Sequence, residues 1–213
     1  GLAAVWAESN DRESIMAAFK RREVYATTGP RISLRFFGGW NFTPADMNSS
    51  DYANIGYTKG VPMGGDLMKG NQGDVPGFLI SAARDPIGAN LDRVQVVKGW
   101  LDAEGKSQEK VFNVAWAGDR QPDTAGKLPA IGNTVNQATA AVSNSIGTDE
   151  LSTLWVDPEF DASVRAFYYI RALQIPTARH SLYDAIALQV TETDRGAKTI
   201  QERAYSSPIW YTP

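Results

Sequence analysis

Histidine and cysteine, the residues that most often hold transition metals or serve as nucleophile and base, are nearly absent from this chain. It contains no Cys and one histidine, His180. Without Cys there is no disulfide, no thiolate nucleophile and no Cys-ligated zinc. One imidazole cannot form a His-rich metal site or act as both base and orienting group. We therefore expect His180 to be a surface or capping residue, and any catalysis confined to this chain to depend on carboxylates.

The carboxylates are plentiful, but their spacing defines no metal site. Asp157, Glu159 and Asp161 alternate like the first ligands of a calcium-binding loop. The turn glycine and the bidentate Glu of such a loop are replaced by Ala162 and Tyr168. We therefore expect a solvated acidic turn here. A second polar stretch could also offer oxygen ligands, from Asp85, Asn90 and Asp92.

Six tryptophans offer a different chemistry, because an exposed indole presents a flat apolar face on which a sugar ring can stack. They are Trp6, Trp40, Trp100, Trp116, Trp155 and Trp210. Their placement inside strand-like patterns favours core packing. A sugar-binding platform stays open as the alternative. The 24 acidic residues form many pairs, and sequence cannot rank any of them as glycosidase carboxylates.

The elements that would position these groups begin with a strand, a helix and a strand in residues 1–40. Asn10 and Glu13 match a capping box, so we expect a helix from Ser9 or Asn10 to about Glu23. Ile15, Ala18 and Phe19 lie on the side of this helix expected to pack against a sheet. A strand, helix and strand at this spacing are typical of the closing unit of an α/β domain.

Residues 41–77 are rich in Gly, Asn, Asp and Pro, and the stretch is too long for an ordinary connection. Strand patterns dominate from residue 78 onward. We expect strands over 78–83, 93–101, 111–116, 138–146, 151–156, 163–175 and 204–211, with a short helix over 183–188. The second and third should form a hairpin, and Pro208 should place the last strand at a sheet edge. These patterns predict a mostly β (α+β) fold, an antiparallel immunoglobulin-like β-sandwich preceded by the strand-helix unit.

Composition narrows the class of partner. With 43% hydrophobic and 21% charged residues, the 213-residue chain is an ordinary globular one, and we expect it to be soluble. A net charge of -3 argues against a nucleic-acid partner, and the absence of a run of about 18 apolar residues argues against a membrane partner. The compartment stays open; an exported or periplasmic location is compatible with the sequence, because exported bacterial proteins often lack Cys.

Five long motifs, in order along the chain, resemble one protein family. They are AVWAESNDRESIMAAFKRREVYATTGPRISLRFFGGW, GYTKGVPMGGDL, NLDRVQVVKGWLD, RAFYYIRALQIP and ERAYSSPIWYTP. In these the chain is similar to the C-terminal region of the bacterial domain-of-unknown-function family 3604. Full-length members of that family carry a domain similar to the polymerase and histidinol phosphatase (PHP) type, a metal-dependent hydrolase barrel.

The resemblance implies a division of the chain into three parts. Residues 1–40 would close the upstream barrel, residues 41–77 would be a long Gly-rich loop or linker, and residues 78–213 would be the β-sandwich domain. The His and Asp ligands of a divalent metal would lie in the barrel, upstream of this chain. We therefore expect no catalytic residue, metal or cofactor within the chain itself.

The resemblance also suggests a substrate entrance. The edge of the barrel mouth would include residues 25–31, and the Gly-rich centre of the long loop, residues 60–66, would be a lid over it. The candidate entrance or lid residues are Tyr25, Thr28, Arg31, Lys59, Met63 and Asp66. Met63 would close over an apolar rim, while Lys59 and Asp66 would face the substrate. An irregular connector between barrel and sandwich is the alternative.

These observations favour a non-catalytic accessory portion of a PHP-like metal-dependent hydrolase, which caps the barrel or shapes its substrate entrance. Its partner would be the upstream barrel of the same polypeptide, and the small-molecule substrate is unknown. Two alternatives stay open. The chain could be a glycan- or small-ligand-binding sandwich module, or a structural or partner-binding domain.

Overall fold

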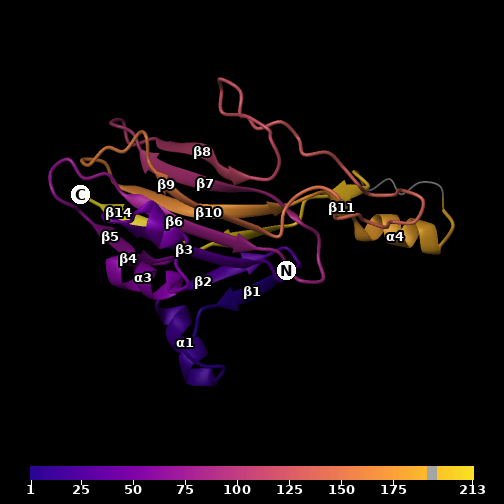
Figure 1. Ribbon diagram of the computed structural model, residues 1–213, viewed down its shortest axis with the longest axis horizontal. Coiled ribbons are helices and arrows are strands. Elements are labelled where there is room, and N and C mark those ends of the chain that lie inside the picture. Colours follow the sequence, from indigo (N-terminus) through magenta and orange to yellow (C-terminus); the bar gives the residue numbers. More distant parts are fainter. Residues whose placement is uncertain (191–195) are drawn as a thin grey trace.

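A computed structural model describes residues 1–190 and 196–213 of the chain. Its strands form two sheets that pack face to face and are antiparallel except for the parallel pair β5 and β14, so the expected mostly β sandwich is confirmed. Figure 1 shows α1 projecting from the sheets and α4 at the far end of the long axis. None of the helices in the described residues has the length and apolar character needed to span a bilayer.

The larger sheet, sheet A, combines strands from both ends of the chain. Its strands are β1 (Leu2–Val5), β2 (Val24–Thr27), β5 (Asp66–Met68), β7 (Leu91–Leu101), β8 (Ser107–Trp116), β10 (Ala166–Gln174), β13 (Arg203–Ser206) and β14 (Ile209–Thr212). β10 lies at the centre, with β7 and then β8 on one side. On its other side β13 and β14 follow one another, and they pair outward with β2 and β5 respectively.

The smaller sheet, sheet B, has the order β4-β3-β6-β9. Its strands are β3 (Ser33–Gly39), β4 (Gly60–Pro62), β6 (Gly77–Ala83) and β9 (Glu150–Val156). A separate two-stranded ladder joins β11 (Thr177–Ala178) and β12 (Thr199–Ile200). The helices are α1 (Arg12–Lys20), α2 (Pro44–Met47), α3 (Tyr52–Lys59) and α4 (His180–Ala187).

The core between the sheets is built by strand alternation. Phe78 of sheet B contacts Tyr168 of sheet A with ring centroids 4.6 Å apart, and it stacks on Phe36 at 5.6 Å. All three side chains are essentially inaccessible to solvent. Burying a large apolar side chain contributes about 1.5–3 kcal/mol, so this aromatic layer is a main source of the sandwich's stability.

The expected hairpin and central strand are confirmed. β7 and β8 form an antiparallel hairpin with a register shift between Val94 and Gln95. β10 pairs with β7 along its whole length, and Tyr168 and Ile170 point into the core. Residues 93–116 and 163–175 therefore contribute to one sandwich, as their alternation indicated.

The first 40 residues differ from the expected barrel unit. β1 and β2 run antiparallel, whereas the strands of a βαβ unit are parallel. β2 continues sheet A through β13, and β3 lies within sheet B between β4 and β6. These residues thus form part of the sandwich in this chain. Their membership of the edge of an upstream barrel stays a prediction.

Helix α1 is shorter than expected at both ends. Its N-cap is Asp11, not Asn10, because the Asp11 carboxylate accepts the amide of Ser14 at 2.8 Å. At the other end Arg22 adopts a positive φ of 62°, and the amide of Glu23 donates to the carbonyl of Ala18. This is a Schellman motif, which ends the helix before Glu23.

The expected packing of the helix was wrong for one residue. Phe19 is 46% exposed and Met16 is 53% exposed, whereas Ala18 is buried and Ile15 is half-buried. Met16 and Phe19 therefore form an exposed apolar part of α1, whereas Ile15 and Ala18 are less accessible.

Two later segments also differ from their predictions. Residues 41–77 are not one loop, because they contain α2, α3, β4 and β5. Residues 138–146 form no regular strand; only an isolated bridge joins Val135 and Val142. There the side chains of Asn136 and Thr139 accept backbone amides two residues further on, which competes with strand pairing.

The terminal strand is interrupted rather than placed at an edge. Pro208 separates β13 from β14, and both lie inside sheet A beside β10. The break leaves the Pro208 carbonyl to accept the amide of Gly64 at 3.0 Å. Pro208 is therefore accommodated at a strand break, where no ladder donor is required.

Candidate functional site

The candidate entrance residues near β2 do not form one site. Tyr25 is half-buried against Trp6, with ring centroids 6.3 Å apart, and burial raises the pKa of its phenol. Thr28 contacts Glu202 and accepts the amide of Arg203 at 2.9 Å. The amide of Arg31 donates to the Asp85 carboxylate at 2.8 Å, while its side chain is exposed. These contacts tie the residues to neighbouring strands and loops.

The candidate lid residues are also separated from one another. Lys59 forms an ion pair with Asp46 at 2.8 Å, at the end of α3. Met63 is 1% exposed and belongs to the core between the sheets. Asp66 forms an ion pair with Arg22 at 2.8 Å on the outer side of sheet A. A lid role would require Met63 to leave the core, and it stays a prediction.

Asp66 lines a groove on sheet A that also contains apolar side chains. A groove of about 670 Å³ lies on the outer face of sheet A, and we call it the aromatic groove. Its apolar lining includes Trp210, Phe167 and Trp100. Its polar lining includes Arg22, Asp66, Glu109 and Arg165.

Strand alternation places the two aromatic rings on the same face. Phe167 and Trp210 are cross-strand partners in β10 and β14, and both alternate with buried core residues. Their ring centroids lie 5.3 Å apart. Phe167 also pairs with Gly99 of β7, and a Cβ atom at Gly99 would overlap the Phe167 ring. The glycine therefore lets Phe167 lie flat against the sheet.

A second hollow of about 570 Å³ surrounds the buried carboxylate of Glu23. The Tyr57 hydroxyl donates to Glu23, and Arg21 forms an ion pair with it at 3.3 Å. The Arg35 guanidinium lies 3.4 Å above the Trp6 ring. Partial burial and the adjacent Glu23 raise the pKa of Tyr57. The Glu23 carboxylate is thus bound by both a cation and a hydroxyl donor, and these contacts give it a structural role.

The other buried carboxylates are also held by partners. Asp92 accepts from Arg120 and Gln201, each at 2.7 Å, and also pairs with Arg93. Asp157 accepts from Lys98 at 2.6 Å and from Tyr168 at 2.8 Å. In residues 1–190 and 196–213, no group of three or more His, Asp or Glu side chains is placed to hold a metal ion.

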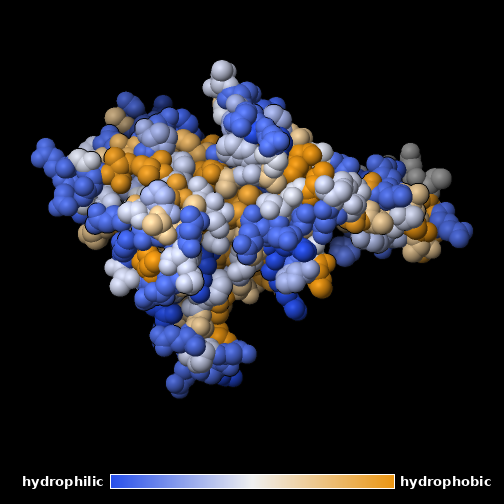
Figure 2. All heavy atoms as spheres, in the orientation of Figure 1, coloured by the Kyte–Doolittle hydropathy of each residue, from blue (hydrophilic) through white to orange (hydrophobic). Residues whose placement is uncertain are grey.

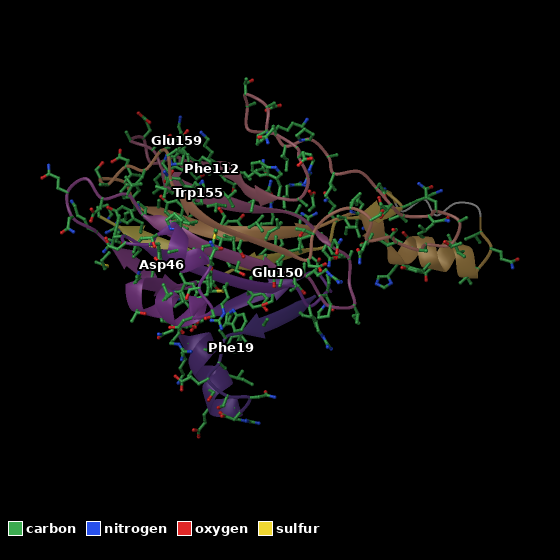
Figure 3. The ribbon with its side chains drawn as sticks, in the orientation of Figure 1. Phe19, Asp46, Phe112, Glu150, Trp155 and Glu159 are labelled. Carbon is green, nitrogen blue, oxygen red and sulfur yellow. The ribbon has the colours of Figure 1, made fainter. Side chains whose placement is uncertain are left out.

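The acidic stretches noted in the sequence are split among different contacts. Glu159 pairs with Lys110, and Asp161 accepts the amide of Ser163 at 2.8 Å. Figure 3 shows Glu159 near Phe112 and Trp155, at the side of the sandwich where β8 and β9 lie, and Asp46 among the short helices. Asn90 binds backbone carbonyls, including that of Ile146.

His180 is exposed at the first position of α4. A surface position agrees with the sequence-based expectation for this residue.

Of the six residues predicted for an entrance or lid, Asp66 alone lines the aromatic groove. Sequence reasoning named Trp210 as one of six tryptophans that could form a sugar-binding platform, and it missed Phe167, Gly99 and Arg165. The period-two pattern of side chains in β10 could have indicated that one face of this strand carries aromatic residues. The neighbour of Phe167 on the next strand depends on register, which the local pattern does not specify.

Fold and groove together define an antiparallel β-sandwich domain with an aromatic groove on its larger sheet. The chain belongs to a family described as a protein of unknown function (DUF3604), whose model matches residues 1–213. Searches of curated proteins and of solved structures each gave no match.

Proposed function

We propose that this chain is a non-catalytic accessory domain of a PHP-like metal-dependent hydrolase, and that it packs against the barrel of the same polypeptide. In that position it caps the barrel or shapes the entrance for a small-molecule substrate. The divalent metal belongs to the barrel. The observation that carries the proposal is the exposed apolar side of α1.

The ion pairing of the buried acidic residues supports a non-catalytic role. Asp92, Asp157 and Glu23 are buried, and each one already has a cationic partner. Moving such a carboxylate to a substrate would leave a buried cation without compensation, which is strongly destabilising. These acids therefore serve the fold.

The exposed side of α1 supports a partner domain. Met16 and Phe19 lie three positions apart on the helix, so their side chains occupy the same face. Figure 2 shows orange, apolar atoms along one side of α1, where Figure 3 labels Phe19. A helix that exposes its apolar side to water gains stability when another element covers that side.

The neighbouring strand gives the same surface an open edge. β1 pairs with β2 on one side and is the terminal strand of sheet A. Leu2 on this strand is 45% exposed. Among residues 1–190 and 196–213 no second strand pairs with β1, which also contacts α1. An unpaired strand edge can accept another strand. A domain built of strands and helices, such as a barrel, can continue both features.

The proposal is tested with Phe19→Ser and the control Lys20→Ser, which changes the next, also exposed, residue of α1. In the isolated chain both variants should change the unfolding free energy by no more than about 0.5 kcal/mol, as surface changes do. In the longer polypeptide that includes the barrel, Phe19→Ser should lower the melting temperature and Lys20→Ser should not. Equal effects of the two variants in the longer polypeptide would overturn the proposal.

A further inference from the structure

We propose that the aromatic groove on sheet A is a binding site for a neutral oligosaccharide, in which a sugar ring stacks on Trp210. This inference is independent of the accessory role proposed above, because no residue of α1 or β1 lines the groove.

The first argument is the exposed aromatic surface. Trp210 is 43% exposed although both of its sequence neighbours, Ile209 and Tyr211, are buried. Its ring lies 5.3 Å from that of Phe167 with an interplanar angle of 50°. Phe167 stacks in turn on Tyr169 at 6.4 Å and 12°. Three aromatic rings from two adjacent strands thus form a continuous surface on the open face of the sheet.

The second argument is that the sheet surface is kept flat beside these rings. Gly99 has no side chain, and the Phe167 ring covers it. Any larger residue at position 99 would displace the ring from the sheet. An amphipathic sugar ring has an apolar face of C–H groups, which fits a flat aromatic surface of this kind.

The third argument is the polar chemistry of the groove. Arg22 and Asp66 form an ion pair at 2.8 Å, and both side chains are about half exposed. Arg165 and Glu109 are exposed at other positions of the lining. Guanidinium and carboxylate groups each present forked donors or acceptors. They can hydrogen-bond to pairs of adjacent hydroxyls while an aromatic ring covers the apolar face of the sugar.

The fourth argument is charge complementarity. Two cations, Arg22 and Arg165, are balanced by two anions, Asp66 and Glu109. A groove without net charge gives no electrostatic advantage to an acidic ligand such as a nucleic acid or an acidic glycan. The ligand class that matches apolar rings and balanced polar groups is a neutral polyhydroxylated one.

The size of the groove agrees with this assignment. Its volume of about 670 Å³ lies within the range of roughly 300–1,000 Å³ that is usual for small-molecule sites. The groove is open along the sheet surface, so a linear chain of several sugar units can lie across it.

The experiment uses the intact chain and isothermal titration with four hexasaccharides. Maltohexaose, cellohexaose and xylohexaose are the neutral probes, and hexagalacturonate is the acidic one. We expect at least one neutral probe to bind and to be preferred over the acidic probe. Trp210→Ala should weaken that binding by about tenfold, the change that corresponds to one stacking contact. Trp210→Phe should retain most of it.

A matched control and a second variant keep the test decisive. Tyr183 is 49% exposed on α4, outside the groove lining, so Tyr183→Ala removes a comparable exposed ring and should leave binding unchanged. Glu109→Ala lies in an exposed stretch of β8 and should weaken binding without affecting the fold. It therefore tests the site even if Trp210→Ala fails to fold.

Three results would overturn the inference. The first is that no neutral hexasaccharide binds to the unmodified chain. The second is that binding is unchanged by both Trp210→Ala and Glu109→Ala. The third is a dimer in sedimentation analysis that Trp210→Ala converts to monomer, because the groove would then be an interface between two copies of the chain.

Discussion

The buried ion pair between Lys98 and Asp157 allows a sharp test of how the sandwich is stabilised. Lys98 is 6% exposed and Asp157 is 2% exposed, and their charged atoms lie 2.6 Å apart. The Lys98 ammonium also donates to the Glu159 carbonyl at 2.7 Å. The Asp157 carboxylate further accepts from the hydroxyl of Tyr168 at 2.8 Å. The pair therefore links β7, the end of β9 and the central strand β10.

Replacing only one partner should be more harmful than replacing both. Lys98→Met leaves the Asp157 carboxylate buried without its cation, and such a change costs about 3–5 kcal/mol. In the double variant Lys98→Met/Asp157→Asn, the second change removes the uncompensated charge. Neutral replacement of a buried pair is often close to neutral in stability, so we expect the double variant to be more stable than Lys98→Met.

The assay is urea unfolding at pH 7, followed by tryptophan fluorescence. A loss for Lys98→Met below about 1 kcal/mol would refute the reasoning, because surface pairs contribute amounts of that size. A double variant less stable than Lys98→Met would also refute it, since the uncompensated charge would then not be the cause.

Three further predictions follow from packing and from backbone hydrogen bonds. Ile170→Ala removes a fully buried side chain and should lower the unfolding free energy by about 2–5 kcal/mol in urea; an unchanged midpoint would show that the site is not tightly packed. Gly56→Ala should lower the melting temperature, because a Cβ atom at position 56 would lie 2.5 Å from the ring of Phe37. This clash should outweigh the helix preference of Ala over Gly, which is about 1 kcal/mol. A higher melting temperature would contradict this. The amides of Arg31 and Ile87 hold the pKa of Asp85 below its usual 3.8, with the Arg31 amide the larger cause. The ionised Asp85 carboxylate therefore contributes its full stability above pH 3.8, and this contribution is lost as the pH falls through the folded-state pKa. The measurement is the unfolding free energy as a function of acid pH. The same pH dependence in Asp85→Asn and in the unmodified chain would exclude this contribution.

The strands with strong alternation could be predicted from the sequence. The pattern around Tyr168 and Ile170 identified the central strand β10, and the pattern of 93–116 identified the hairpin. These predictions succeeded because the period-two pattern directly reflects burial on one face of a sheet.

Pairing between distant strands could not be predicted in the same way. Nothing in residues 2–7 and 24–28 indicates that β1 and β2 are antiparallel or that β2 pairs with β13, far along the chain. The helix start was displaced by one residue because Asn10 and Asp11 are both good N-caps. The alternation of residues 138–146 was weak evidence, since it involves small side chains that bury little area.

The groove was missed for a related reason. Phe167 and Trp210 are 43 positions apart in the sequence, and their contact depends on the register of β10 with β14. Sequence reasoning had assigned most tryptophans to the core. That expectation holds less well for Trp210, which lies at an outward position of β14 between the buried residues Ile209 and Tyr211.

The central claim, that α1 packs against a barrel of the same polypeptide, is tested most directly by hydrogen exchange. The amides of residues 14–20 would be measured in the isolated chain and in the longer polypeptide, with the amides of β10 as the internal reference. Because Met16 and Phe19 face solvent here, we expect α1 to exchange faster than β10 in the isolated chain and to gain protection in the longer polypeptide. Equal exchange of α1 in the two proteins would contradict the account.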